Sequence, residues 1–263
     1  MLAHDVSGAG PPLVLLHFLG GSRHVWRDLL PALERERRVV TIDLPGFGDS
    51  PPLAGAPTVP RIAAAVGETI DALGLDRPSV AGVSLGGAVA LELALAERVA
   101  SAVAVSPLGF ASAPEAAFAK ASLRATHAAC KAIALRADLV TAAKPLRAAL
   151  GAQMFAKPWE VPAGDLAELV RGVAQSPGMI PVMRATVGFE FSGGATSSAV
   201  TIAWGQRDAL LLPRQGPRAV QRLPFARLVP LSGCGHIPLW DDPAQVTDTI
   251  LQGTGAVAGP VTV

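Results

Sequence analysis

The chain of 263 residues is half hydrophobic, which is enough apolar material for the core of one large α/β domain or two small ones. Its 22 Lys and Arg nearly balance 21 Asp and Glu, so the whole-chain charge predicts neither nucleic acid nor membrane as a partner. Cys130 and Cys234 show neither metal-binding spacing nor a disulfide framework, and no segment reads as a signal peptide or membrane span. These features predict a cytoplasmic globular protein.

Short β-branched runs alternate with amphipathic segments of helical length through the first hundred residues. We expect strands in the runs PLVLLHF, RRVVTIDLP, SVAGVS and ASAVAVSP, and helices near 26–34, near 59–73 and from residue 85. Runs that are apolar on both faces are typical of central strands in a parallel sheet that is covered by helices on each side. The alternation therefore predicts βαβ units.

The alternation stops after Pro107 and resumes with the strand run AVTIAWG, a helix near 214–222, the run ARLVPLS and a last helix near 243–252. The intervening residues read as helices and loops. The chain divides accordingly into a first core part, a helical insertion and a second core part at 1–108, 109–198 and 199–263. We expect the insertion to cap the carboxyl ends of the strands, and a separately folded helical domain with a structural role is the alternative.

Three polar side chains follow strand runs at positions that suit nucleophilic catalysis. Ser84 stands between Gly82 and Gly86 in a G-x-S-x-G pattern where a strand gives way to a helix, a pattern that is weak evidence alone. Asp208 follows AVTIAWGQR, and His236 follows ARLVPLSGCG. Because ligands of open α/β sheets gather at the carboxyl ends of the strands, we expect these three side chains to meet there.

Five ordered motifs, LLHFLGGS, VVTIDLPGFGDS, GVSLGG, WGQRD and GCGHIPLWDDP, resemble the successive signatures of the α/β-hydrolase superfamily. The resemblance runs through nearly the whole chain outside the insertion. It implies a mostly parallel sheet flanked by helices and a catalytic triad of Ser84, Asp208 and His236, with His236 as the base and Asp208 as the residue that orients it. Members hydrolyse esters, amides, thioesters or activated C–C bonds, so the fold alone does not choose the substrate.

The rival polar residues are expected to have structural roles. The family counterpart of Asp43 anchors a loop, so Asp43 is expected to be structural. Asp241 and Asp242 precede Pro243, and both are expected to cap the last helix. His17 is expected to brace its loop rather than act as a second base.

The oxyanion hole is expected to use the backbone N–H of Leu85 and, by family register, that of Leu19. Here the chain departs from the family, because His17 is followed by Phe18 where many relatives have glycine. We therefore expect either a strained loop or a bulky ring beside the acyl pocket. The few residues before PLVLLHF also predict that the first antiparallel strand of the family is missing, which leaves a sheet edge that a homodimer could cover.

Aromatic residues are the first candidates for the pocket wall, namely Phe18, Phe110, Phe155 and Trp159. Further apolar candidates from the insertion are Phe118, Met154, Met179 and Met183. Both sets fit an apolar substrate, although such residues are more often packing than pocket. The basic residues Lys120, Arg124, Arg147 and Arg184 could meet a substrate carboxylate or lie on solvated helix faces.

The sequence as a whole predicts a serine hydrolase, most simply a carboxylic ester hydrolase, that cleaves a small, largely apolar ester or lactone through an acyl-enzyme on Ser84. No phosphate loop, dinucleotide motif or metal cluster is evident, so no cofactor and no metal are expected. The alternatives are a C–C bond hydrolase, a cofactor-independent perhydrolase or haloperoxidase on the same triad, and a ligand-binding member without turnover.

Overall fold

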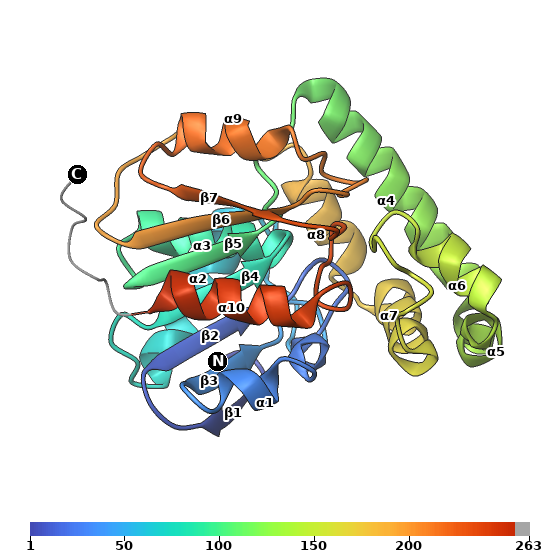
Figure 1. Ribbon diagram of the computed structural model, residues 1–263, viewed down its shortest axis with the longest axis horizontal. Helices are drawn as coiled ribbons and strands as arrows, with labels where there is room; N and C mark the ends of the chain where they lie inside the picture. The colour runs from blue at the N-terminus through green and yellow to red at the C-terminus, as the bar shows by residue number, and fades with distance from the viewer. Residues whose placement is uncertain (256–263) are drawn as a thin grey trace.

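Seven strands form one sheet in the order β1-β3-β2-β4-β5-β6-β7 in the computed structural model, which describes residues 1–255 (Figure 1). The strands are β1 (His4–Gly8), β2 (Pro12–Leu16), β3 (Arg38–Ile42), β4 (Ser79–Val83), β5 (Ser101–Val105), β6 (Ala199–Gly205) and β7 (Arg227–Leu231). The pairs from β3 through β7 are parallel, so the carboxyl ends of β4, β6 and β7 lie at one edge of the sheet.

Strand β1 corrects the expectation of a missing first strand. His4–Gly8 pairs antiparallel with β3, with Val6 opposite Val40, and so extends the sheet at its edge. The segment HDVSG carries only one large apolar residue and is mostly exposed, because an edge strand has a neighbour on one side only. Such a strand does not produce the apolar run by which the central strands are recognised.

Side chains of the strands β2 to β6 alternate between two apolar cores, one on each face of the sheet. On β2, for example, Val14 and Leu16 point into one core, and Leu13 and Leu15 point into the other. The first core is covered by α2 (Val59–Ala72), α3 (Leu85–Leu95) and α9 (Gln215–Arg222). The second is covered by η1 (Arg23–Trp26), α1 (Leu30–Leu33) and α10 (Pro243–Thr254). Burial on both faces explains why these strands read as continuous apolar runs.

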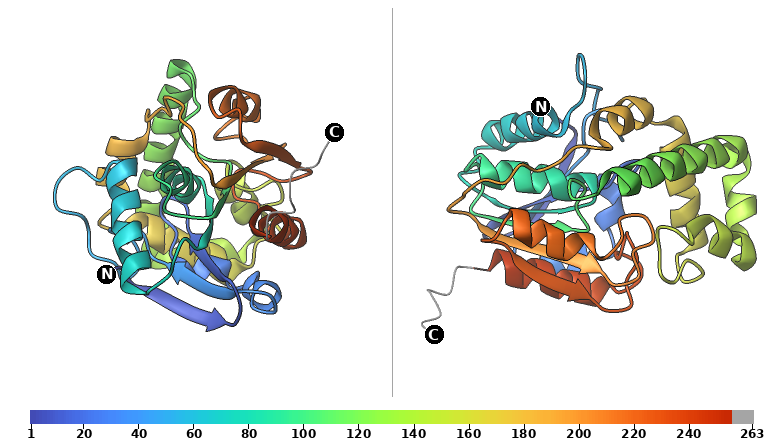
Figure 2. Two further views of the ribbon diagram at one scale, coloured as in Figure 1. Left: turned by 90° about the vertical axis from the view of Figure 1, so that its left-hand side faces the viewer. Right: turned by 90° about the horizontal axis from the view of Figure 1, so that it is seen from above.

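The elements between β5 and β6 are all helical in the described chain. They are α4 (Ala113–Ile133), η2 (Ala134–Arg136), α5 (Ala137–Ala142), α6 (Lys144–Gly151), α7 (Ala163–Gln175) and α8 (Met179–Thr186). In Figures 1 and 2 the helices α4 to α7 extend beyond one edge of the sheet, with α5 and α6 farthest from it. A capping box at Ser112 and Glu115 begins α4, the longest of these helices.

Two predicted helices differ in extent from the observed ones. The segment expected to form one helix near 26–34 forms the short helices η1 and α1 instead. Helix α10 continues to Thr254, beyond its predicted end. The last eight residues of the predicted second core part, 256–263, lie outside the described residues.

Candidate active site

Ser84 occupies a strained turn between β4 and α3. Its backbone has φ 54° and ψ −108°, a left-handed conformation that non-glycine residues rarely adopt. The Ser84 N–H donates to the Val105 carbonyl at 2.8 Å, which ties the turn to the neighbouring strand β5. The strain is therefore held in place by the sheet, and it lifts the hydroxyl away from the strand.

Two glycines make this turn sterically possible. A Cβ on Gly82 would lie 2.3 Å from the carbonyl of Gly86, and a Cβ on Gly86 would lie 2.2 Å from the Leu16 carbonyl oxygen. Both distances are far below ordinary contact, so only glycine allows α3 to approach β2 and β4 this closely. The G-x-S-x-G pattern is thus a packing requirement of the strand-to-helix turn.

Ser84, His236 and Asp208 form one hydrogen-bonded chain. His236 Nε2 lies 3.0 Å from Ser84 Oγ, and His236 Nδ1 lies 2.8 Å from Asp208 Oδ2. An ionised carboxylate can only accept, so Nδ1 carries the proton and Nε2 is free to accept from the serine hydroxyl. The arrangement can draw a proton from a hydroxyl group, as a general base requires.

Backbone contacts fix the two loops that carry the acid and the base. Asp208 Oδ1 accepts the N–H groups of Leu210 and Leu211 at 2.9 and 2.8 Å, which leaves Oδ2 for the imidazole. The Arg207 N–H donates to the Cys234 carbonyl at 2.8 Å, which joins the Asp208 loop to the loop before His236. The side chains of Ser84, His236 and Asp208 are all buried, so the hydrogen bonds between them are shielded from water.

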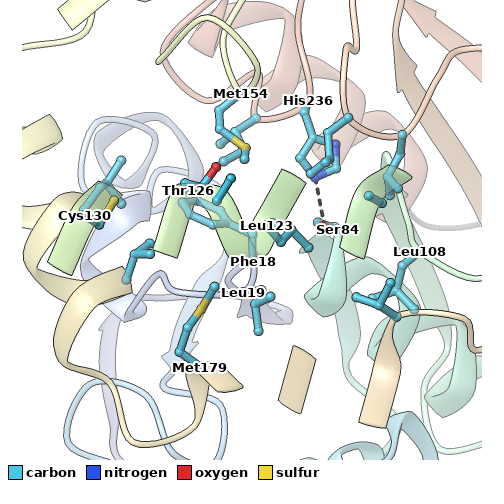
Figure 3. A pocket seen from close by; sticks show the side chains of 18 of the residues that line it. Phe18, Leu19, Ser84, Leu108, Leu123, Thr126, Cys130, Met154, Met179 and His236 are labelled. Atoms are coloured by element: carbon cyan, nitrogen blue, oxygen red, sulfur yellow. Dashed lines mark hydrogen bonds between the residues drawn. The ribbon is translucent and has the colours of Figure 1, made fainter. Parts of the chain in front are cut away.

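The two backbone groups expected to form the oxyanion hole are unpaired in the described part of the chain. Neither the Leu19 nor the Leu85 N–H donates to a protein acceptor within residues 1–255. Leu85 is the first residue of α3, so its amide is one of the free donors at a helix start. Leu19 also borders the cavity beside Ser84 (Figure 3).

His17 braces the loop that carries Leu19. The Leu44 N–H donates to His17 Nε2 at 2.9 Å, so His17 Nδ1 carries the proton and donates to the Phe18 carbonyl at 2.7 Å. The Gly21 N–H donates to the same carbonyl at 3.0 Å. Because the peptide bond is planar and trans, fixing the Phe18 carbonyl also fixes the direction of the Leu19 N–H. Complete burial lowers the pKa of His17 to about 4, so the ring is neutral at pH 7.

Phe18 does not strain this loop. It is absent from the residues with positive φ, whereas Gly20 has φ 85°. The residue of this loop with a left-handed backbone is therefore Gly20. It lies two residues after Phe18, the position where many relatives have glycine. Of the two expectations for Phe18, the strained loop is wrong, and the bulky ring beside the pocket is what the structure contains.

Asp43 anchors the loop after β3. Its carboxylate accepts the N–H of Arg23 at 2.6 Å and that of Asp49 at 2.9 Å, and it forms an ion pair with the Arg23 guanidinium. A Cβ on Gly48 would lie 2.1 Å from this carboxylate, so the loop folds tightly around it. Every described contact of this side chain is structural, and none reaches Ser84 or His236.

The two aspartates before Pro243 have different roles. Asp242 caps α10 by accepting the Gln245 N–H at 2.9 Å, as predicted. Asp241 does not cap the helix, which corrects the expectation. Its carboxylate accepts the N–H groups of Gly235, Ala156 and Lys157 at 2.8 to 3.0 Å. Asp241 therefore joins the loop that carries His236 to the helical insertion.

An apolar cavity of about 340 Å³ lies between the sheet edge and the insertion (Figure 3). Ser84 and His236 border it on one side, and Cys130 of α4 lies across the cavity from them. Its lining has no Asp, Glu, Lys or Arg side chain among the described residues. The wall is formed mostly by leucine, valine, alanine, methionine and phenylalanine side chains, so the cavity suits a neutral apolar group.

The predicted pocket residues divide into two groups. Phe18 and Phe155 line the cavity, as do Met154 and Met179. Phe110 is instead buried in the core and stacks on Phe191, and Trp159 is 48% exposed on the surface, so neither lines the cavity. The four basic candidates, Lys120, Arg124, Arg147 and Arg184, are likewise absent from the wall.

Helix α4 supplies wall residues that are not among the residues predicted to form the pocket. Ala116, Ala119, Leu123, Thr126 and Cys130 recur at three- and four-residue spacing and all face the cavity. This three- and four-residue spacing is the sequence signal by which these wall residues can be grouped. It marks one face of a helix but does not say whether that face meets a core or a cavity.

The two cysteines offer no rival nucleophile at neutral pH. Burial raises the pKa of the Cys130 thiol to about 11 and that of Cys234 to about 12, so both thiols are protonated at pH 7. In the part of the chain that the structure describes, no group of three or more His, Cys, Asp or Glu side chains could hold a metal ion.

None of the helices within residues 1–255 is long and apolar enough to cross a membrane.

The chain is similar in sequence to several known proteins over part of their length. The pimeloyl-(acyl-carrier protein) methyl ester esterase of Aeromonas hydrophila subsp. hydrophila is 44% identical over 103 residues, which are 38% of this chain and 39% of that protein. Two other curated relatives match this chain over a segment of similar length, and that segment is only 28% of the length of each relative. The chain thus spans well under two thirds of the length of these relatives.

Two solved structures share the fold over nearly all of both chains. The enol-lactonase from Burkholderia xenovorans LB400 is 22% identical with a TM-score of 0.75, and the match covers 95% of each chain. The 2-hydroxy-6-oxo-6-phenylhexa-2,4-dienoate hydrolase from Rhodococcus sp. strain RHA1 is 21% identical with a TM-score of 0.75, covering 96% of this chain and 94% of that one. The sequence model of the alpha/beta hydrolase fold matches residues 11–243, and the chain therefore belongs to the α/β-hydrolase fold family.

Proposed function

We propose that the protein is a serine hydrolase that cleaves an apolar carboxylic ester or lactone through an acyl-enzyme on Ser84. The observation that carries the proposal is the hydrogen-bonded chain from Asp208 through His236 to Ser84, whose hydroxyl borders an apolar cavity. The fold and the named relatives support a hydrolase, and the 44% identical segment belongs to an ester esterase.

Acylation uses the serine, the base and the unpaired amides. As Ser84 Oγ bonds to the ester carbonyl carbon, His236 Nε2 takes the hydroxyl proton, and Asp208 stabilises the charged imidazole. The oxyanion that forms accepts the N–H groups of Leu85 and Leu19. His236 then donates the proton to the alkoxide oxygen as the bond from that oxygen to the acyl carbon breaks.

Deacylation repeats the cycle with water. His236 takes a proton from water as the water oxygen bonds to the acyl carbon of the Ser84 ester. The bond to Ser84 Oγ then breaks, and His236 returns the proton to that oxygen. The products are a carboxylic acid and an alcohol, or a hydroxy acid from a lactone, and the enzyme is restored without a cofactor or metal.

The cavity wall supports a neutral, apolar substrate. A substrate carboxylate would find no Lys or Arg among the described wall residues, and burial of an unpaired charge is unfavourable. Side chains from α4, α6, α7 and α8 complete the wall, which supports a role of the insertion as a cap over the site. The partner proposed is thus a small ester-like molecule.

The test is fluorophosphonate labelling with peptide mapping, together with a series of p-nitrophenyl esters of increasing acyl length. We expect labelling at Ser84 and turnover of apolar esters. The Ser84→Ala variant should lose labelling and at least about 10³-fold in kcat. Ser122→Ala is the matched control, because Ser122 lies in α4 and bonds to Gln153 away from the reaction.

The outcomes separate the competing functions. Labelling without turnover of any ester would contradict the ester substrate and direct the search to C–C bonds or to peroxide-dependent chemistry on the same residues. Absence of labelling in a folded protein would contradict the nucleophile and favour a ligand-binding member of the family. Labelling retained in Ser84→Ala would contradict the assignment of Ser84 itself.

A further inference from the structure

The far end of the helical insertion exposes an unusual set of apolar side chains. In this segment, called here the tip (residues 131–147), Leu135 is 99% exposed, Leu139 is 73% exposed and Leu146 is 47% exposed. Single exposed leucines are ordinary on a protein surface. Three within one short stretch of consecutive helices, η2, α5 and α6, are an unusual local concentration of exposed apolar side chains.

The tip is also the most one-sidedly basic part of the insertion. It contains Lys131, Arg136, Lys144 and Arg147 and a single acidic residue, Asp138. The Asp138 carboxylate pairs with Arg171 of α7 at 3.1 Å, so it does not neutralise the cations of the tip. Lys131, Arg136 and Lys144 of the tip are all exposed.

The tip lies at the end of the molecule, away from the sheet. Figures 1 and 2 place α5 and α6 beyond the sheet, at one end of the long axis of the molecule. The residues on either side of the tip border the cavity, whereas the tip itself does not. Cys130 precedes the tip and Leu150 follows it, and both line the cavity. A flat partner could therefore meet the tip without contacting the rest of the protein.

We propose that the tip docks on the surface of an anionic lipid bilayer. The leucines would enter the boundary between head groups and acyl chains, and the cations would meet anionic head groups. A second copy of this chain fits less well, because a two-fold contact would place the basic tip against itself. The docking is independent of the proposed catalytic function, since no tip residue belongs to the hydrogen-bonded chain of Ser84.

The test is co-sedimentation of the full chain with vesicles of phosphatidylcholine, with or without about one third phosphatidylglycerol. We expect binding to the anionic vesicles that weakens as salt is added, because surface charges are screened. The triple variant Leu135→Ser, Leu139→Ser, Leu146→Ser should partition at least about tenfold less. The triple variant Lys131→Glu, Arg136→Glu, Lys144→Glu should also lose binding to the anionic vesicles.

The matched control is Val6→Ser with Phe225→Ser, which removes exposed apolar side chains from the sheet domain. It should bind vesicles as the unaltered chain does. Circular dichroism and thermal unfolding check that every variant folds. Failure of the unaltered chain to bind anionic vesicles would overturn the proposal, as would equal binding by the leucine variant. A dimer in solution that the leucine variant abolishes, without vesicle binding, would identify a second copy as the occupant.

Discussion

Lys157 of the helical insertion donates its backbone N–H to the Asp241 carboxylate at 2.8 Å, and Asp241 also accepts the N–H of Gly235, the residue before His236. The Ile237 N–H adds a 2.8 Å bond to the Met154 carbonyl of the insertion. A Cβ on Gly235 would lie 2.7 Å from the Ala156 nitrogen, so the two segments are in direct contact. The position of the imidazole is thus coupled to the insertion through the buried Asp241 carboxylate and through the Ile237 backbone bond.

The first prediction concerns this carboxylate. Asp241→Asn keeps the size of the side chain but replaces one acceptor oxygen with an NH₂ group that faces backbone donors. We expect kcat on an accepted ester to fall about tenfold, with a smaller change in KM, because His236 is displaced while the cavity remains. Steady-state kinetics well below the unfolding temperature provide the measurement.

The control for this variant is Asp242→Asn, since Asn caps a helix about as well as Asp. Asp242 caps α10 and makes no bond to the insertion, so turnover should be unchanged. Equal losses of kcat in the two variants would show that the effect is general to the loop. An unchanged kcat in Asp241→Asn would show that the tether does not position the base.

The second prediction tests whether the acyl chain of the substrate lies against the face of α4 that lines the cavity. Thr126 faces the cavity, whereas Ala128 of the same helix is exposed. Thr126→Phe should fill part of the cavity and reduce kcat/KM for an octanoate ester at least about tenfold more than for an acetate ester. Ala128→Phe adds the same ring outside the cavity and should leave the ratio unchanged. A Thr126→Phe ratio like that of the unaltered chain would contradict this path for the acyl group.

The triad positions and the sheet could be anticipated from sequence for the same physical reason. Strands buried on both faces read as apolar runs, and parallel strands bring the residues that follow them to one edge. Ser84 and Asp208 follow the buried strands β4 and β6, and His236 follows the parallel edge strand β7. The structure brings the three side chains within hydrogen-bond distance. Their catalytic role stays a prediction.

Other features depend on tertiary contacts that no local pattern encodes. Phe110 and Phe155 are equally aromatic, yet one is packed in the core and the other lines the cavity. Asp241 and Asp242 both precede a helix, and only the position of the insertion gives Asp241 a different partner. Similarly, the near-zero charge of the whole chain says nothing of the local excess of cations in the tip.

The third prediction concerns stability against acid. His17 has a pKa of about 4 in the folded protein, against 6.5 for an unperturbed histidine. Between these values the unfolded chain binds a proton that the folded protein does not, so the free energy of unfolding decreases as the pH falls. This contribution is fully present above pH 6.5, and about 2 kcal/mol of it should be lost by about pH 5.

Comparison with His17→Gln isolates this contribution, because every other titrating group is retained. The variant is expected to be less stable at neutral pH, where it lacks the imidazole bonds to Leu44 and Phe18. Its free energy of unfolding in urea should nevertheless fall less than that of the unaltered chain between about pH 7 and about pH 5. Parallel losses in the two proteins would contradict a neutral, buried His17.

The fourth prediction concerns the close approach of α3 to the end of β2. In Gly86→Ala the new Cβ would lie 2.2 Å from the Leu16 carbonyl oxygen and 2.6 Å from that of His17, and backbone atoms cannot yield cheaply. We expect a loss of at least about 2 kcal/mol in the free energy of unfolding. Moving the start of α3 also shifts the Leu85 N–H, so fluorophosphonate labelling should slow in the folded fraction.

The control for this variant is Gly164→Ala in α7, whose Cβ would have open space around it. It should leave the free energy of unfolding unchanged or raise it by about 0.5–1 kcal/mol. Equal stabilities in the two variants would show that the turn tolerates a Cβ at Gly86, and the glycine pattern would then lose its steric explanation.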